Sequence, residues 1–473
     1  MERYALYING GWVETEETID VLDKYSQTTY ATVAKASREH VDEAISSATK
    51  AYRKNQLSPY QRFEILRNVS TLMKNNKEEL AYTITKEAGK PLKQARTEID
   101  RSAETFLLAA EEAKRIHGEG VPVEAAPGSE HRMAFTIKVP VGVVGAISPF
   151  NFPLNLVAHK VAPALAAGNA VVLKPASKTP LASLKLAKLL EEAGLPKGLL
   201  QVVVGSGSVV GQQMMDDERI DLYTFTGSAE VGLQLKQNTG LNRLILELGN
   251  NSPVIVDKEA DIDHAAKTLA GQSFAFAGQV CISVQRVYVH ESIQERFLET
   301  FSEQIKQLLV GDPTDATTDV GPMISVSEAE RAETWIHEAV DKGAKVVLGG
   351  KREGALLEPT ILTDVKPEMR VVCEEIFAPV VSVIAYTDLD SCIEEVNQSV
   401  YGLQGGIFTQ NIDTAYYAAK RVEVGGFMIN DGSQYRVDLM PYGGVKDSGN
   451  GKEGPKYSIE EMTEERLIVM NLR

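Results

Sequence analysis

Three side chains that together could perform acyl chemistry on sulfur lie in separate short segments. Cys281 stands in segment 278–283, GQVCIS, Glu247 in segment 246–250, LELGN, and Asn151 in segment 148–153, SPFNFP. A thiolate is a strong nucleophile, a carboxylate can activate water, and an amide N–H can stabilise an oxyanion. A lone buried cysteine is more often inert packing, so the prediction rests on the three segments together.

Each of the other two side chains also has a structural alternative. Asn151 could be a turn residue, because asparagine is common in turns. Glu247 could be a solvated carboxylate, although its position between Leu246 and Leu248, at the edge of an apolar segment, is unusual for one. Both catalytic roles are favoured only because Cys281 is present as well.

In this order the three segments resemble the signatures of the aldehyde dehydrogenase superfamily, from about residue 7 to the C-terminus, and the local sequences look most like the lactaldehyde dehydrogenase-like branch. The resemblance implies that Cys281 attacks an aldehyde carbon and that Asn151 and the Cys281 N–H hold the oxyanion. A hydride then passes to a nicotinamide, and Glu247 activates the water that hydrolyses the thioester. Asn250 replaces the family's second glycine, but Gly249 remains.

Composition limits the remaining possibilities. A chain of 473 residues predicts two or more domains, and its net charge of −16 argues against nucleic acid as the main partner. Three widely spaced cysteines form no disulfide framework. No apolar run of about 18 residues and no basic-then-apolar leader occurs. We therefore expect a cytoplasmic protein with no membrane partner and no metal site.

Alternating strands and helices predict an α/β fold with parallel sheets, in which the continuous apolar run 141–147 is a buried strand that precedes Asn151. The resemblance implies an aldehyde dehydrogenase-like fold of two doubly wound parallel-sheet domains plus a β-hairpin oligomerisation arm, and a homodimer or homotetramer. We assign residues 1–120 and 141–249 to a dinucleotide-binding domain and 250–454 to a catalytic domain. The oligomerisation segment comprises 121–140 and 455–473.

The chain around Asn151 gives finer expectations. A helix should begin at Pro153 and end at Ala167 before Gly168. The next apolar run ends at Lys174, where an open parallel sheet usually holds a ligand group. A surface lysine is the alternative, but it is less common directly after an apolar run.

Gly227 and Ser228 are the candidate phosphate site, because glycine allows close approach and Ser228 precedes a predicted helix whose first N–H groups are unpaired. An ordinary serine cap is the alternative. The glycine-rich segment 205–211, GSGSVVG, departs from the usual dinucleotide spacing and is better explained as a structural turn.

The resemblance adds further cofactor contacts, with NADP or NAD as the cofactor. Lys174 would contact the ribose, and Ser177 with Lys178 would tolerate a 2′-phosphate, which a glutamate at the serine's position would repel. We therefore expect use of NADP, either alone or beside NAD. Glu375 would bind the nicotinamide ribose and Phe377 would flank the nicotinamide; without the resemblance, both would be interpreted as part of an exposed loop.

The substrate is less determined. Arg436 could pair with an anionic group of the substrate or form a structural salt bridge, with Asp438 among the possible partners. His159 could contact a hydroxyl or be a core histidine. Val280 stands where non-phosphorylating glyceraldehyde-3-phosphate dehydrogenases have arginine, which weakens a phosphate interpretation. The candidate pocket residues are Asn155, His159, Val280, Ile282, Gln434, Tyr435 and Arg436.

We therefore expect oxidation of a small hydroxyaldehyde of the lactaldehyde type. The substrate could carry an anionic C3 group, as sulfolactaldehyde and glyceraldehyde-3-phosphate do. Succinate semialdehyde is the competing substrate, because segment 174–177, KPAS, also resembles that branch. A non-catalytic structural or binding homologue is the alternative of another class, and the presence of Cys281, Glu247 and Asn151 together argues against it.

Overall fold

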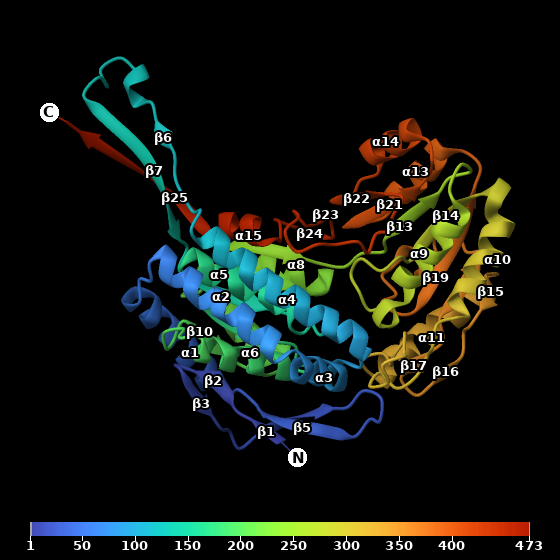
Figure 1. Cartoon of the computed structure of the whole chain (residues 1–473), viewed down its shortest axis with the longest axis horizontal. Helices are drawn as coiled ribbons and strands as arrows, with labels where there is room; N and C mark the ends of the chain where they lie inside the picture. The colour runs from blue at the N-terminus through green and yellow to red at the C-terminus, as the bar shows by residue number, and fades with distance from the viewer. Residues whose placement is uncertain (1, 473) are drawn as a thin grey trace.

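The computed structural model describes residues 2–472. Two large β-sheets lie side by side, each covered by helices, and a narrow arm extends from one of them (Figure 1). Among helices of the described residues, none is long and apolar enough to cross a membrane. The α/β fold with two sheets matches the expectation from the sequence.

The first sheet has eight strands, in the order β24-β12-β11-β8-β9-β10-β2-β3. The five central strands are parallel, and the three outer ones pair antiparallel. Since the chain visits β8, β9 and β10 on one side and then β11 and β12 on the other, the order reverses between β8 and β11. Its strands are β2 (Leu6–Ile8), β3 (Gly11–Val13), β8 (Val143–Ile147), β9 (Ala170–Lys174), β10 (Leu200–Val202), β11 (Leu222–Thr226), β12 (Arg243–Glu247) and β24 (Gly449–Asn450).

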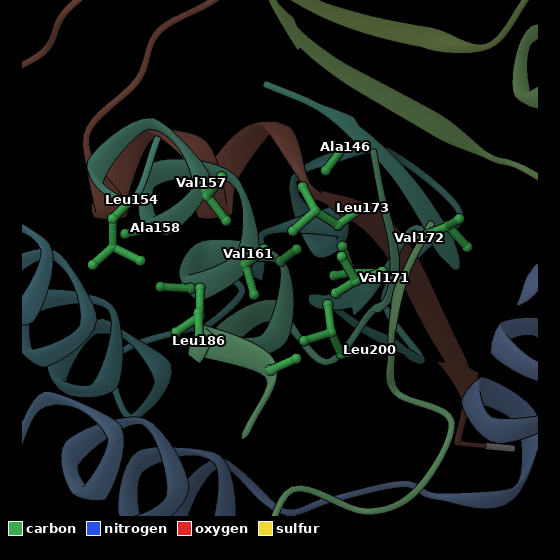
Figure 2. Close-up of a cluster of buried hydrophobic side chains, with 14 of the residues drawn as sticks. Ala146, Leu154, Val157, Ala158, Val161, Val171, Val172, Leu173, Leu186 and Leu200 are labelled. Carbon is green, nitrogen blue, oxygen red and sulfur yellow. The ribbon is translucent and has the colours of Figure 1, made fainter. Parts of the chain in front are cut away.

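Helices cover both faces of this sheet, and α5 lies buried between the sheet and other helices. All of its residues are buried, including the polar Asn155, His159 and Lys160. Figure 2 shows its valines packing against side chains of β9. The helices are α1 (Arg38–Lys54), α2 (Pro59–Asn75), α3 (Lys77–Ala88), α4 (Leu92–Ala113), α5 (Asn155–Ala167), α6 (Leu181–Glu192), α7 (Gln212–Met215), α8 (Ala229–Asn238) and α15 (Pro455–Glu461).

The second sheet has seven strands, in the order β15-β18-β19-β14-β13-β21-β22, all parallel except β15. Its strands are β13 (Pro253–Val256), β14 (Arg286–His290), β15 (Lys345–Leu348), β18 (Thr360–Thr363), β19 (Val380–Tyr386), β21 (Gln404–Phe408) and β22 (Gly426–Ile429). Its helices are α9 (Ile262–Phe274), α10 (Gln294–Ile305), α11 (Val326–Asp341), α12 (Arg370–Cys373), α13 (Leu389–Asn397) and α14 (Ile412–Arg421).

The arm is a three-stranded sheet of β6 (Gly120–Val121), β7 (Arg132–Pro140) and β25 (Thr463–Asn471). β25 pairs antiparallel with β7 along its whole length. Figure 1 shows the arm projecting away from the body. Small sheets complete the chain: β1 (Glu2–Tyr4) with β5 (Thr29–Ala34) and β4 (Thr18–Leu22), β16 (Arg352–Glu353) with β17 (Leu356–Leu357), and β20 (Tyr401–Gly402) with β23 (Val445–Lys446).

Two details differ from the sequence-based expectations. Helix α5 begins at Asn155 rather than at Pro153, because the Glu98 carboxylate accepts from the backbone N–H groups of Leu154 and Asn155 and so caps the helix there. Strand β24, which lies within the segment assigned to the catalytic domain, pairs with β12 of the first sheet. The domain boundaries themselves stay a prediction.

Candidate active site

Cys281 is held by a strained loop that follows α9. The turn η3 (Ala275–Gly278) contains Phe276 and Ala277 with φ of 47° and 52°, and Gly278 follows with φ 68°. A Cβ on Gly278 would lie 2.1 Å from the carbonyl oxygen of Ala378, so only glycine fits. Such backbone strain is common at functional sites, and here it fixes the loop that carries Cys281.

Two cavities meet at Cys281. The first, which we call the Gly227 cleft, is lined among others by Asn151, Gly227, Ser228, Glu375, Phe377 and Cys281. The second, the Arg436 pocket, is lined among others by Lys90, Arg101, Phe152, Asn155, Gln434, Arg436, Tyr442 and Cys281. A thiol at this junction can react with a molecule in the Arg436 pocket while a second molecule lies in the Gly227 cleft.

The parallel strands of the first sheet bring the sequence motifs together. Asn151 follows β8 and Gly227 follows β11, and these two strands flank the point where the strand order reverses. Glu247 is the last residue of β12, the next strand along. Ligands of open α/β sheets bind at this reversal, beyond the carboxyl ends of the strands.

The Cys281 thiol and the Glu247 carboxyl are both in environments that disfavour charge. Burial raises the pKa of the Cys281 thiol to about 12, although hydrogen bonding to Tyr442 and the charge of Arg436 oppose this. Both Glu247 carboxyl oxygens are buried without a hydrogen-bond partner. Burial, together with the nearby Glu453 carboxylate, raises the pKa of Glu247 well above its usual value. Because its pKa is raised, Glu247 can act as a base only once it has lost its proton.

The far end of the Gly227 cleft suits an anionic group. Ser228 begins α8, and its hydroxyl accepts from the Val231 N–H at 3.4 Å. A Cβ on Gly227 would lie 2.5 Å from the Phe225 ring. The predicted serine cap is therefore present, and it leaves other N–H groups of the first helical turn facing the cleft end, where a pyrophosphate is favoured.

Glu375 and Phe377 line the same cleft, as Cys281 does. The Glu375 carboxylate accepts from the Asn250 N–H at 2.9 Å, and burial raises its pKa to about 7. Phe377, at φ 49°, packs edge-to-face on Phe150 with ring centroids 5.9 Å apart. The roles of both residues at a nicotinamide and its ribose stay a prediction.

Lys174, Ser177 and Lys178 lie outside the lining of the Gly227 cleft. Lys174 is buried at the end of β9, and burial lowers its pKa to about 8. The Ser177 hydroxyl donates to the Gly205 carbonyl at 2.6 Å. Lys178 is exposed and contacts the Ser325 hydroxyl at 3.4 Å. The glycine-rich segment thus contacts Ser177 through its first residue, and its residues Gly207–Gly211 form a wide helical turn.

Every cation in the lining of the Arg436 pocket already has a carboxylate partner. Arg436 donates to Glu453 at 3.0 Å, and its guanidinium lies 3.6 Å from the centroid of the Tyr442 ring. Arg101 forms two hydrogen bonds to Asp438, and Lys90 pairs with Glu98. The salt-bridge alternative for Arg436 is therefore present, with Glu453 rather than Asp438 as the partner. Its Nε–H is buried without an acceptor.

The predicted pocket residues divide into two groups. Asn155, Val280, Ile282, Gln434 and Arg436 line the pocket. His159 is fully buried outside that lining, with Nε2 2.8 Å from the Asp438 carboxylate, and burial lowers its pKa. His159 therefore corresponds to the core alternative and reaches the pocket only through Asp438 and Arg436. Tyr435 is half exposed and does not line the pocket.

Sequence interpretation missed the contribution of α4. Gln94, Thr97, Glu98 and Arg101 all line the Arg436 pocket. Their spacing of three and four residues puts polar side chains on one face of a helix, and that pattern was visible in the sequence. Arg331 of α11, which lines the Gly227 cleft, carried no comparable signal.

Comparison with known proteins identifies the chain. The model of the aldehyde dehydrogenase family matches residues 12–468. The chain belongs to the aldehyde dehydrogenase family. The enzyme is 54% identical over 472 residues to the 3-sulfolactaldehyde dehydrogenase of Priestia aryabhattai, covering 100% of this chain and 99% of the relative. It is 44% identical to the lactaldehyde dehydrogenase of Methanocaldococcus jannaschii, and the match covers 98% of this chain and 100% of the relative.

Solved structures agree. The enzyme resembles aldehyde dehydrogenase 21 of Physcomitrella patens in complex with the reaction product succinate, with a TM-score of 0.96, 41% identity and coverage of 100% and 98%. It also resembles glyceraldehyde-3-phosphate dehydrogenase GapN of Methanocaldococcus jannaschii complexed with NADP, with a TM-score of 0.93, 43% identity and coverage of 97% and 100%. The predicted family, branch and fold are confirmed.

The enzyme is an NAD(P)-dependent aldehyde dehydrogenase. The Gly227 cleft fits a dinucleotide, because it combines the α8 N-terminus with the buried Glu375 and Phe377. Within residues 2–472, no group of three His, Cys, Asp or Glu side chains could hold a metal ion.

Proposed function

We propose that the enzyme oxidises a small aldehyde with an anionic group at its far end, of the 3-sulfolactaldehyde type, to the carboxylic acid. The observation that carries the proposal is the position of Cys281 between the Gly227 cleft and the Arg436 pocket. A relative that is 54% identical to this chain bears the name 3-sulfolactaldehyde dehydrogenase.

The charges of the Arg436 pocket support an anionic substrate. Arg436 is almost fully buried and has an unsatisfied Nε–H, and Arg101 stands in the same lining. A buried donor without an acceptor costs about 1–3 kcal/mol, which an oxygen of a sulfonate or carboxylate would offset. The Glu453 and Asp438 partners keep both guanidinium groups in place before the substrate binds.

In the proposed reaction the Cys281 thiolate attacks the aldehyde carbon, and the Asn151 amide with the Cys281 N–H stabilises the oxyanion that forms. Bound NAD(P) supplies the hydride acceptor, held by Gly227, Ser228, Glu375 and Phe377, with Lys174, Ser177 and Lys178 toward the adenosine end. Glu247 then accepts a proton from the water that hydrolyses the thioester. For this step Glu247 must be ionised, so its raised pKa favours turnover at alkaline pH.

Formation of reduced cofactor by the purified enzyme tests the substrate class. Sulfolactaldehyde, succinate semialdehyde, glyceraldehyde-3-phosphate, lactaldehyde and glycolaldehyde would each be assayed with NAD and with NADP. We expect the highest kcat/KM for an anionic aldehyde. A higher value for lactaldehyde or glycolaldehyde would contradict the anionic class while leaving the dehydrogenase activity in place.

Succinate semialdehyde is a second candidate, favoured by the succinate complex of the Physcomitrella patens enzyme. Both candidates end in an anion, so both would use Arg436 and Arg101. They differ at the carbon beside the aldehyde, where sulfolactaldehyde bears a hydroxyl. Asn155, whose side-chain amide donates to Asp438 at 3.2 Å, is the lining residue that we assign to this hydroxyl.

We also propose that the arm joins subunits into a homodimer or homotetramer of a cytoplasmic enzyme. Five large apolar side chains stand exposed on β7, β25 and the residue after it, namely Met133, Leu467, Val469, Met470 and Leu472. Exposed apolar side chains gathered on a projecting sheet are typical of an interface. Sedimentation of a variant with Leu467→Glu and Val469→Glu would reveal smaller particles; an unchanged assembly would contradict the proposal.

A further inference from the structure

The hydroxyl of Tyr442 lies 3.0 Å from Cys281 Sγ. Tyr442 is buried and reaches the thiol from segment 441–449, which is remote from Cys281 in the chain. Its backbone N–H donates to the Glu453 carbonyl at 3.1 Å, and the Glu453 N–H donates back to the Tyr442 carbonyl at 2.6 Å. The backbone that carries the phenol is thus held independently of the thiol.

The ring of Tyr442 is fixed from its face as well. The Arg436 guanidinium lies 3.6 Å from the ring centroid, and Glu453 holds that guanidinium through a 3.0 Å ion pair. A cation over the ring face withdraws electron density and makes the phenol O–H a better hydrogen-bond donor. Arg436 therefore favours the orientation in which the tyrosine donates and sulfur accepts.

The thiol needs such a donor. Burial raises the pKa of Cys281 to about 12, and the carboxyl groups of Glu375 and Glu247 also raise it. Only Tyr442, through its hydrogen bond, and Arg436, through its charge, act among the main causes in the opposite direction. The thiolate, not the thiol, is the nucleophile, so these two groups favour the reactive form.

We propose that Tyr442 is a further catalytic residue, whose hydroxyl donates a hydrogen bond to the Cys281 thiolate and holds Sγ at the junction of the two cavities. The thiol proton leaves to water and the phenol keeps its own proton. When Sγ bonds to the aldehyde carbon, the electron pair of the C=O bond moves to oxygen, and Tyr442 is released from sulfur. This inference rests on the proposed nucleophilic role of Cys281.

Alkylation of Cys281 by iodoacetamide tests the hydrogen bond without any aldehyde. In this reaction the thiolate forms an S–C bond and iodide leaves, so its rate follows the thiolate fraction. The label on the peptide that contains Cys281 would be counted by mass spectrometry across pH, because Cys373 is exposed and reacts independently. Tyr442→Phe removes only the hydroxyl, and Tyr416→Phe makes the same change at an exposed tyrosine as a control.

We expect Tyr442→Phe to shift the alkylation profile upward by about one to two pH units, and to lower the rate at neutral pH about tenfold to a hundredfold. Tyr416→Phe should match the parent enzyme. A Tyr442→Phe profile that superimposes on the parent profile would overturn the proposal. A merely structural role would lower the affinity for NADP, measured by fluorescence titration, and leave the pH profile in place.

The two proposals fail in different ways. If Cys281 were not the nucleophile, Cys281→Ser would still oxidise aldehydes, whatever the alkylation profile. If Tyr442 did not stabilise the thiolate, Cys281→Ser would be inactive but Tyr442→Phe would alkylate as the parent enzyme does. The pH profile of kcat/KM gives a second readout, which should move in the same direction as the alkylation profile in Tyr442→Phe.

Discussion

The Gly227 cleft is lined in part by a glycine and by the serine that caps a helix N-terminus, whereas the Arg436 pocket is lined by charged side chains that are already paired. The cleft thus presents backbone donors that any dinucleotide can use. The pocket instead places two guanidinium groups at fixed positions, and removing either takes a charged partner from a buried carboxylate, Asp438 or Glu453. Recognition of the cofactor should therefore tolerate change better than recognition of the aldehyde.

Cys281 belongs to both regions, so its loss should have the largest effect. We expect Cys281→Ser to lower kcat/KM by more than about a thousandfold, because a neutral serine hydroxyl is a far weaker nucleophile. Binding of NADP, measured by fluorescence titration, should change little. Cys373→Ser, at an exposed cysteine, is the matched control. Substantial turnover in Cys281→Ser would remove the covalent mechanism.

Glu247→Gln should have the next largest effect, with kcat lowered by about 10² to 10⁴. The change is nearly isosteric and puts no new charge in the site, so binding in both cavities should persist. Glu460→Gln, at an exposed glutamate on α15, is the control. Steady-state kinetics measure the effect, and a kcat within a few-fold of the parent would show that another group activates the water.

A change at Arg101 sharpens the contrast between the two regions. Arg101→Gln should raise the KM for an anionic aldehyde about tenfold to a hundredfold, through loss of a charged hydrogen-bond donor. The KM for NADP and for lactaldehyde should stay near parent values. Arg96→Gln, on the exposed side of the same helix, is the control. An equal rise in KM for anionic and neutral aldehydes would mean that Arg101 only holds Asp438 in place.

The pH dependence of cofactor binding should be the smallest effect. The pKa of Glu375 is raised to about 7, so its carboxylate gains a proton as the pH falls through that value. The ionised Glu375 carboxylate would accept a hydrogen bond from the nicotinamide ribose. The Kd for NADP should then rise as the pH falls, by about tenfold per pH unit at most. Glu375→Gln should flatten this profile. A parent Kd that does not change on acidification would place the ribose elsewhere.

The difference between the regions also explains what the sequence could predict. Gly227 with Ser228, and Glu375 with Phe377, are near neighbours in the chain, so each motif is visible as a unit. Apolar runs in the sequence predict the strands that end near Asn151 and Glu247. These strands, β8 and β12, lie on either side of β11 in the first sheet. The Arg101–Asp438 and Lys160–Glu453 pairs join residues 337 and 293 positions apart, and no local pattern encodes such partners.

The same reasoning accounts for the helix start that changed and for the alternatives that the sequence left open. Glu98 caps α5 from a distant helix, so the helix start could not be located from Pro153 alone. The partner of Arg436 is Glu453 rather than the nearby Asp438, because Arg101 already occupies that carboxylate. His159 contacts Asp438 and Arg436 from the buried side of α5. Its position follows from the packing of that helix.

The covalent intermediate on Cys281 is the central claim, and Glu247→Gln provides the most direct way to observe it. The variant would be mixed with NADP and the best aldehyde substrate, quenched in acid, and its intact mass and Cys281 peptide measured. We predict close to one acyl group per chain on Cys281, together with one equivalent of reduced cofactor formed in a burst. Reduced cofactor that forms steadily while Cys281 stays unmodified would contradict the account.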